Sequence, residues 1–320
     1  RGGRNSTKRD SLQGQISFLL PFEKPELQSE EDTKEEVKEL NTNSIAILKD
    51  EEDESISSSF NIDNEIGETN ENHILINYKY DPIDEIGVGG LKTKFKNNIE
   101  AIKILKVIES EHRLATAEEQ KILVKYVGWG GMPQVFDKNS VSWSREYEKL
   151  KSILTPDEYS SARASTPNAH YTSPCIIQAI YNALNNFGFK GGNILEPAMG
   201  VGNFFSMLPE NMINSKLYGV ELDDISGRIS KQLYQNADIK IQGFEEIDYP
   251  DNFFDIAIGN VPFGDYKLFD NKYNKYNFLI HDYFFAKAID TVRPGGIIAF
   301  VTSKGTMDKE DDSIRKYIAK

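Results

Sequence analysis

The sequence predicts an α/β fold with a doubly wound, mostly parallel sheet, preceded by a helical appendage and an acidic tail. From residue 170 onward, short apolar segments alternate with longer amphipathic ones, which is typical of a parallel sheet. The first short segment ends in the turn Gly200-Val201-Gly202, and the second ends in Glu221. Because ligands bind beyond the carboxyl ends of parallel strands, these two ends are the first candidates for a binding site.

Residues 1–75 form the predicted tail. Within it, residues 23–72 hold 17 acidic and four basic residues, a net charge of −13 that equals the charge of the whole chain. Such a composition cannot bury enough apolar surface to offset chain entropy, so we expect the tail to be mostly disordered. The remaining body is close to neutral, and the acidic chain charge therefore says little against nucleic-acid binding by the body.

One apolar island, Gln15–Phe22, interrupts the tail. It is slightly similar to the Gln-x-x-Leu-Phe peptides that dock on the bacterial sliding clamp, and this similarity implies the clamp as a partner. The alternative interpretation is a short hydrophobic patch that folds onto the body.

The composition also indicates a compartment. The single cysteine, Cys175, excludes an internal disulfide and fits a reducing cytosol. No apolar run approaches the ~20 residues that a membrane span needs, and no signal peptide is present. We therefore expect a cytoplasmic protein without a membrane partner or a metal site. Because the chain lacks an initiator Met, we expect a fragment or a processed piece of a longer protein.

Residues 76–165 are predicted to be the helical appendage. Apolar residues recur at helical spacing over residues 94–127, and the stretch Gly128–Pro133 breaks this pattern. Thr116 followed by Glu119 is typical of a helix start, because the hydroxyl caps free amides and the acid suits the positive helix end. The other expected helices of the appendage are Ser144–Leu154 and Pro156–Ala164, the latter capped by Thr155.

Residues 166–320 are predicted to hold the sheet. The expected strands are Asn193–Glu196, Lys216–Leu222, Ile239–Gln242, Asp255–Gly259 and Gly296–Thr302. The expected helices are Ser173–Phe187, Asn203–Leu208, Ile225–Asn236 and Phe278–Val292. A turn at Pro294-Gly295-Gly296 should introduce the last strand, and a further helix begins near the C-terminal end.

The glycine turn and the following acid predict a nucleoside-binding site. Gly200 and Gly202 allow the backbone to approach a ligand where a Cβ would collide. Glu221 stands about 20 residues further on, where an acid can accept hydrogen bonds from two ribose hydroxyls. The alternatives are a tight strand–helix turn for the glycines and a surface acid for Glu221.

The same segment favours S-adenosylmethionine over a dinucleotide. The dinucleotide fingerprint needs a third glycine, but here Gly202 is followed by Asn203-Phe204-Phe205. Glu196-Pro197 also places an acid beside the loop, which is unfavourable for phosphate and suits the sulfonium and ammonium groups of S-adenosylmethionine.

A second candidate site, Asn260-Val261-Pro262-Phe263, follows the predicted fourth strand. A nitrogen conjugated to an aromatic ring or a carbonyl group is a poor nucleophile because its lone pair is delocalised. The Asn260 side-chain oxygen and the Val261 carbonyl can accept its N–H groups and favour a localised lone pair, while Phe263 can stack on a planar ring. Catalysis would then rest on positioning and preorganised dipoles. The alternative is a plain strand-end turn.

Together the two segments resemble the cofactor loop and the Asn-Pro-Pro-Phe/Tyr motif of amino-group methyltransferases, especially DNA adenine-N6 enzymes. The resemblance spans roughly residues 166–310 and implies a Rossmann-like methyltransferase sheet with S-adenosylmethionine as cofactor. The implied cofactor-binding residues are Thr172, Glu196, Pro197, Ala198, Gly200, Gly202, Glu221, Leu222, Phe244 and Glu245. The implied catalytic residues are Asn260, Val261, Pro262 and Phe263.

Four of these positions depart from the family pattern or allow another explanation. Thr172 lies in a segment similar to the family's extra cofactor motif, where a hydroxyl and backbone amides hold the cofactor carboxylate, but it could serve only as a helix cap. Phe244 and Glu245 lie where the family contacts the cofactor adenine, although the usual Asp-Phe is not clearly present. Val261 replaces a proline, so a fixed φ is lost while the backbone acceptor is retained.

The order of the motifs is similar to that of adenine methyltransferases whose target-recognition region lies C-terminal to the catalytic core. The stretch Tyr126–Gly131 further resembles large methylase–helicase proteins of plasmids, phages and conjugative elements, in which a helicase region would follow. No Gly-x-x-x-x-Gly-Lys-Ser/Thr loop is present in this chain, and the last two strands of a complete methyltransferase sheet are also missing.

The resemblance implies a restriction-modification type of enzyme that transfers a methyl group from S-adenosylmethionine to the N6 of adenine in DNA. A target adenine in a duplex would have to leave the base stack to reach Asn260. One alternative is a protein glutamine-amide N-methyltransferase, since a planar amide needs similar acceptors. Another is a non-catalytic, DNA-associated scaffold of a mobile element, which the missing strands and Val261 favour.

Overall fold

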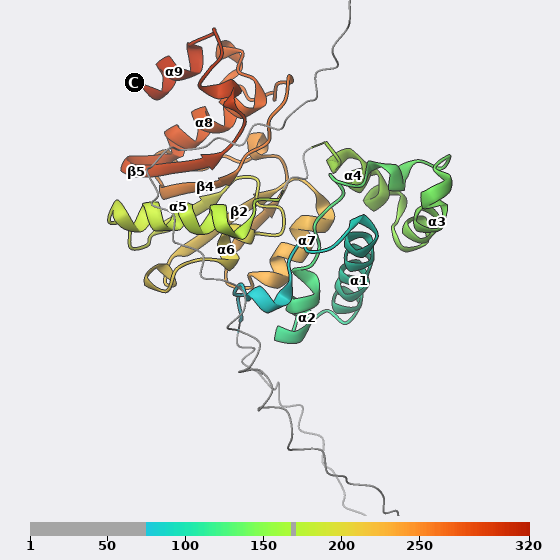
Figure 1. Ribbon diagram of the computed structural model, residues 1–320. Coiled ribbons are helices and arrows are strands. Elements are labelled where there is room, and N and C mark those ends of the chain that lie inside the picture. Colours follow the sequence, from blue (N-terminus) through green and yellow to red (C-terminus); the bar gives the residue numbers. More distant parts are fainter. Residues whose placement is uncertain (1–74, 168–170) are drawn as a thin grey trace, which may run out of the picture. The chain divides into compact units, whose positions relative to one another are not determined.

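The computed structural model describes residues 75–167 and 171–320 (Figure 1). The predicted acidic tail, except for Leu75, and the segment Gln15–Phe22 lie outside the described residues, as does His170. All described residues belong to one compact unit.

The centre of this unit is a five-stranded sheet in the order β3-β2-β1-β4-β5, and every neighbouring pair of strands is parallel. The strands are β1 (Asn193–Glu196), β2 (Lys216–Glu221), β3 (Asp238–Ile241), β4 (Phe254–Asn260) and β5 (Val292–Val301). The strand order reverses between β1 and β4, and a reversal of this kind opens a crevice at the carboxyl ends of the strands.

Helices cover both faces of the sheet, as in a doubly wound fold (Figure 1). Neighbouring strand residues point to opposite faces: Ile194 packs with Ile177 of α5 and Ile229 of α7, whereas Leu195 packs in the cluster that holds Phe284 of α8. The helices of this part are α5 (Pro174–Asn186), α6 (Asn203–Ser206), α7 (Asp224–Leu233), α8 (Ile280–Thr291) and α9 (Ser313–Ile318). The short 3-10 helices are η4 (Glu210–Met212), η5 (Phe244–Glu246), η6 (Asn274–Tyr276) and η7 (Lys304–Thr306).

The start of β5 differs from the prediction. Pro294-Gly295-Gly296 was expected as a turn before the strand, but β5 begins at Val292, directly after α8. Phe254 of β4 pairs with Val292, and Ile256 pairs with Ile297, so the glycines form a bulge inside the strand. The φ of +76° at Gly295 is a conformation that glycine adopts without strain.

The predicted helical appendage contains α1 (Leu91–Ser110), α2 (Ala117–Leu123), α3 (Ser144–Ile153) and α4 (Pro156–Ser165), with η1 (Pro82–Asp84), η2 (Pro133–Phe136) and η3 (Val141–Trp143). Thr116 and Thr155 form full capping boxes with Glu119 and Glu158, so both predicted caps are confirmed. Between α2 and η2, Trp129 is fully buried.

One continuous hydrophobic core joins these helices to the sheet. Phe95 and Trp129 from the helical part belong to the same buried cluster as Ile194 and Ile256 from the strands. Helix α7 lies between the sheet and α1 and contacts both α1 and α4 (Figure 1).

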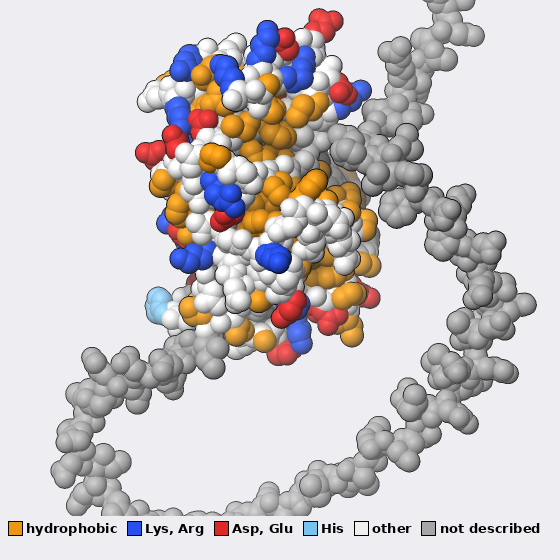
Figure 2. Space-filling model, turned by 90° about the vertical axis from the view of Figure 1, so that its left-hand side faces the viewer, with side chains coloured by type: hydrophobic (Ala, Val, Ile, Leu, Met, Phe, Trp, Pro, Cys, Tyr) orange, Lys and Arg blue, Asp and Glu red, His pale blue; other side chains and the backbone are white. Residues whose placement is uncertain are grey.

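Apolar side chains also reach the surface on the face shown in Figure 2, where they gather in the middle with charged side chains of both signs around them. Surface apolar area of this kind is common in folded proteins. Within residues 75–167 and 171–320, no helix is long and apolar enough to span a membrane.

Candidate functional site

A cavity of about 260 Å³ lies at the carboxyl ends of β1, β2 and β4, where the strand order reverses. Most of the residues predicted from the sequence line it. They are Thr172, Glu196, Pro197, Ala198, Gly200, Glu221, Leu222, Phe244, Glu245, Asn260 and Pro262. The structure thus brings residues of both predicted segments, the glycine loop and the tetrapeptide that begins at the last residue of β4, to one cavity.

Gly202, predicted to bind the cofactor, is not among the cavity-lining residues. Its φ is +79°, and a Cβ at this position would collide with the ring of Tyr234. The Tyr234 hydroxyl donates a hydrogen bond to the Gly202 carbonyl at 2.5 Å. Gly202 is therefore required by packing of the loop against α7 and the residue that follows it.

Val261 and Phe263 flank the cavity without lining it. The Val261 side chain is buried in the core on the α8 side of the sheet, and its N–H donates to the Val301 carbonyl at 3.1 Å. Phe263 is 40% exposed and follows the cavity-lining Pro262. Its ring is thus accessible from outside the cavity.

The Glu221 carboxylate joins the glycine loop to the end of β2. It accepts hydrogen bonds from the Gly200 N–H at 2.7 Å and from the Asp223 N–H at 2.8 Å. Burial, together with the charge of Asp223, raises the pKa of Glu221 to about 7. This carboxyl group is consequently poised between its neutral and its charged form near neutral pH.

Glu196 is a second acid of the cavity and is almost completely buried. Burial raises the pKa of Glu196 well above its usual range, and the charge of Glu221 adds to the effect. Gly259 allows β4 to approach it, because a Cβ there would stand 3.3 Å from the Glu196 Cγ. A cationic ligand would favour the charged form of both acids.

Three buried polar atoms of the cavity have no hydrogen-bond partner among the described residues: Thr172 Oγ1, Asn203 Oδ1 and Glu196 Oε2. Buried polar atoms are nearly always satisfied, so these atoms indicate a place for a polar ligand. Thr172 is not the cap of α5, which begins after Ser173. The capping interpretation of Thr172 is therefore not supported.

Phe244 and Glu245 belong to the 3-10 helix η5 at the end of β3. Phe244 is buried and packs against Phe284 of α8 with ring centroids 5.1 Å apart. Leu222, at the end of β2, is 73% exposed although it lines the cavity. An apolar side chain at the mouth and an aromatic ring at the base suit the flat faces of a purine.

Several residues that line the cavity were not predicted from the sequence. Tyr171 lies against the glycine loop, its ring about 3.5 Å from the position of a Cβ on Gly200. Tyr266 and Leu268 come from the long loop between β4 and α8. Ser161, Ala164 and Ser165 of α4 also line the cavity, although they lie outside the region predicted to form the sheet. Nothing in the local sequence of α4 links it to the strand ends, whereas Asp223 could have been found as the second acid after Glu221.

Part of the chain is similar to a known protein family. Residues 177–320 match the model of the Eco57I restriction-modification methylase family. The fold is a Rossmann-like sheet of the kind expected from the sequence for a methyltransferase. The chemistry of the cavity fits the expected S-adenosylmethionine, since the cavity offers two buried acids for a cation and unpartnered polar atoms for a polar group.

Two curated relatives match shorter parts of the chain. Defense against restriction protein B of Escherichia phage P1 is 28% identical over 137 residues, which cover 41% of this chain and 6% of that protein. The type II methyltransferase M.CvrRI of Paramecium bursaria Chlorella virus XZ-6E is 31% identical over 113 residues, covering 35% of this chain and 29% of that protein. The chain thus matches less than a third of the length of either relative.

Two of the solved structures that match the chain have low sequence identity and a low TM-score. A putative class I S-adenosylmethionine-dependent methyltransferase from Listeria monocytogenes is 16% identical with a TM-score of 0.39, covering 71% of this chain and 79% of that chain. A modification subunit of a putative type I restriction enzyme from Vibrio vulnificus YJ016 is 15% identical with a TM-score of 0.39. The match covers 63% of this chain and 46% of that chain.

Proposed function

We propose that this protein transfers a methyl group from S-adenosylmethionine to the exocyclic N6 of adenine in DNA. The observation that carries the proposal is the position of Asn260, which lines the cofactor cavity at the end of β4, next to the strand that bears Glu196. An amide oxygen at this place can meet an incoming amine beside the methyl donor.

The residues after β4 would prepare the amine. The Asn260 side-chain oxygen and the Val261 carbonyl accept hydrogen bonds from its two N–H groups, which localises the nitrogen lone pair. Phe263, exposed beside the cavity, stacks on the base after it has left the duplex. None of these groups needs an unusual pKa, so the chain contributes positioning and oriented dipoles. When bound, S-adenosylmethionine supplies the electrophilic methyl group.

The remaining predicted residues would hold the cofactor. Glu221 accepts the ribose hydroxyls, and Leu222 with Phe244 encloses the adenine. Glu196 lies near the positive charges of the methionine part, whose carboxylate the Thr172 hydroxyl contacts. The burial of these acids and the unpartnered Thr172 oxygen support this assignment. Glu245, at the same end of β3, completes the adenine side of the site.

DNA is the proposed partner, in a restriction-modification setting that the family suggests. A helicase region elsewhere in the protein is a further proposal. The similarity to a far longer phage protein is compatible with such a region. A contact with the sliding clamp through residues 15–22 is a separate proposal.

Replacement of Asn260 tests the mechanism. Asn260→Ala should abolish methyl incorporation into DNA while S-adenosylmethionine affinity stays near wild type, because the side chain meets the nucleophile and not the donor. Asn211→Ala, an exposed residue hydrogen-bonded to Asn185, is the matched control and should leave both quantities unchanged. The assay is transfer of labelled methyl to DNA followed by digestion to nucleosides.

Three results would contradict the proposal. Equal methylation by the Asn260→Ala protein would remove this residue from the mechanism. A wild-type protein that binds cofactor and DNA but transfers no methyl group would favour the non-catalytic scaffold, and transfer to a glutamine-containing protein would favour the amide methyltransferase.

A further inference from the structure

Helix α4 lies outside the residues that match the methylase family, yet Ser161, Ala164 and Ser165 of this helix line the cofactor cavity. We infer that α4 is the outer wall of the nucleoside end of the cofactor site, and that an ion-pair network centred on Arg228 holds it there. The inference rests on the proposed assignment of Glu221 to the ribose.

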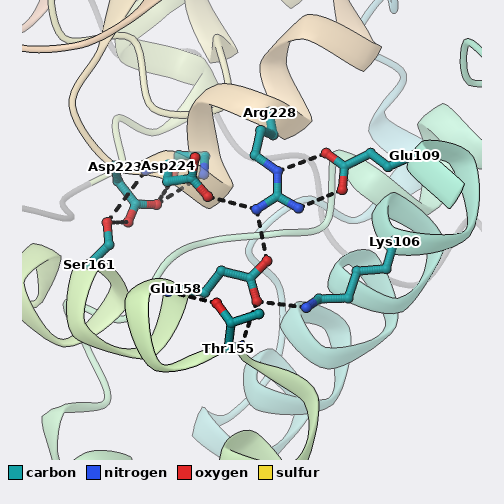
Figure 3. A network of polar contacts seen from close by, with 9 residues as sticks. Lys106, Glu109, Thr155, Glu158, Ser161, Asp223, Asp224 and Arg228 are labelled. Atoms are coloured by element: carbon teal, nitrogen blue, oxygen red, sulfur yellow. Dashed lines mark hydrogen bonds and ion pairs between the residues drawn. The ribbon is translucent and has the colours of Figure 1, made fainter. Parts of the chain in front are cut away.

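The contact between α4 and the sheet identifies the end of the cavity that the helix covers. The Ser161 hydroxyl donates to the Asp223 carboxylate at 3.2 Å (Figure 3). Asp223 follows Glu221 by two residues, and its own N–H donates to the Glu221 carboxylate. The unpartnered Thr172 and Asn203 atoms belong to other segments, before α5 and after the glycine loop. Helix α4 therefore stands beside the proposed ribose acceptor.

Arg228 on α7 connects three helices at this point (Figure 3). Its guanidinium donates to Glu109 of α1 at 2.7 Å, to Glu158 of α4 at 2.8 Å and to Asp224 of α7 at 2.6 Å. The Arg228 side chain is only 22% exposed. Ion pairs that are partly buried and joined by several hydrogen bonds are screened less by solvent and salt than pairs on the surface. The network thus fixes α4 to the helix that begins directly after Asp223.

Glu158 is the member of the network that belongs to α4 itself. It also accepts from Lys106 of α1 at 2.6 Å and closes the capping box with Thr155. Burial alone would raise the pKa of Glu158, but the hydrogen bonds from Lys106 and Arg228 outweigh it and bring the pKa to about 2. Glu158 is therefore charged at neutral pH and stays in the network.

Apolar packing of α4 comes mainly from two residues. The buried Ala162 removes little apolar surface from water, and the partly buried Tyr159 packs against Phe136 with ring centroids 5.3 Å apart. The hydrogen bonds of Glu158 and Ser161 are the polar contacts that join α4 to α7 and to the residue before it. A change in the network should move the wall and, with it, the cofactor affinity.

A steric test addresses the wall directly. Ala164 lines the cavity and is otherwise exposed, so Ala164→Trp can fold while it fills the nucleoside end. Ser160→Trp, at an exposed position of α4 that does not line the cavity, is the matched control. Calorimetric titration with S-adenosylhomocysteine and with adenosine should show affinity reduced by roughly tenfold or more for Ala164→Trp and unchanged for Ser160→Trp.

A second test addresses the network. Arg228→Met should lower S-adenosylhomocysteine affinity severalfold and speed hydrogen exchange of the α4 amides. Arg113→Met is the control, because Arg113 makes a comparable double contact with Glu119 at 2.6 Å but does not line the cavity or touch α4. It should leave both readouts unchanged, and thermal melting will show that each protein is folded.

The outcomes separate the inference from the proposed function. If Glu221→Ala binds S-adenosylhomocysteine like the wild type, the proposed cofactor assignment fails. If Glu221→Ala loses affinity while Ala164→Trp and Arg228→Met bind like the wild type, the role of α4 is overturned and the proposed function stands. Loss of affinity in all three, with both controls unchanged, supports the inference.

Discussion

At the residue scale, two buried acids determine the electrostatics of the cavity. Burial raises the pKa of both Glu196 and Glu221; the charge of Glu221 raises the pKa of Glu196 further, and the charge of Asp223 does the same for Glu221. Burial and neighbouring negative charge both favour the neutral form of these acids. A cationic ligand such as the proposed methyl donor would favour their charged forms and would therefore be attracted to this cavity.

The pKa of Glu221 predicts a pH dependence. Between its usual value of 4.5 and the folded value of about 7, the folded state binds more protons than the unfolded state, so the stability of the cofactor-free protein should fall as the pH rises through this window. Cofactor affinity should rise over the same range, because an ionised carboxylate accepts stronger hydrogen bonds. Denaturation and calorimetry at several pH values measure the two effects. In Glu221→Gln, the pH dependence of stability and the pH dependence of cofactor affinity should both be weaker. A cofactor affinity of the wild type that does not change with pH would exclude Glu221 from binding.

The two glycines of the loop should respond differently to substitution. Both have positive φ, but a Cβ on Gly202 collides with Tyr234, whereas one on Gly200 meets the Tyr171 ring at an ordinary 3.5 Å. Gly202→Ala should therefore destabilise the protein by about 1–3 kcal/mol from backbone strain plus the cost of the collision, and more than Gly200→Ala. Urea denaturation of both variants checks the order. A smaller loss for Gly202→Ala would contradict the packing argument.

At the scale of elements, local chemistry predicted the starts of helices and most strands. Thr116 and Thr155 were recognisable as caps because a hydroxyl three residues before Glu is a local pattern. The bulge in β5 was not recognisable, because the same Pro-Gly-Gly sequence can precede a strand or interrupt one. The position of α4 at the cavity depends on Arg228, about 70 residues away in the sequence, and no local pattern carries such a pairing. The roles of the predicted site residues, unlike their positions, stay predictions.

The two capping boxes offer a comparison between elements. Thr116→Ala and Thr155→Ala should each cost about 1 kcal/mol of stability, because each leaves an amide at a helix start without its acceptor. Only Thr155→Ala should also weaken cofactor binding. Thr155 caps α4, and its replacement removes the capping contact that helps to position Glu158. Denaturant titration and calorimetry on both proteins measure this, and equal binding by the two would contradict a special role for α4.

At the scale of the whole molecule, the shared core predicts that the helical part and the sheet unfold together. Trp129 and Trp143 are the only tryptophans of the chain, and both are buried in the helical part. Their fluorescence should change at the same urea concentration at which the amides of β1 and β4 lose protection from hydrogen exchange. Loss of the fluorescence signal at a clearly lower concentration would show that the helical part is a separate folding unit.

The position of the single thiol has a practical consequence. Cys175 is exposed in the first turn of α5, three residues after the cavity-lining Thr172. Because the chain contains one cysteine, a maleimide dye would attach at this one position without any engineered change. The dye would sit near Thr172, at the proposed methionine end of the site. A fluorescent reporter of donor occupancy, independent of methyl transfer, is thus available in the natural sequence.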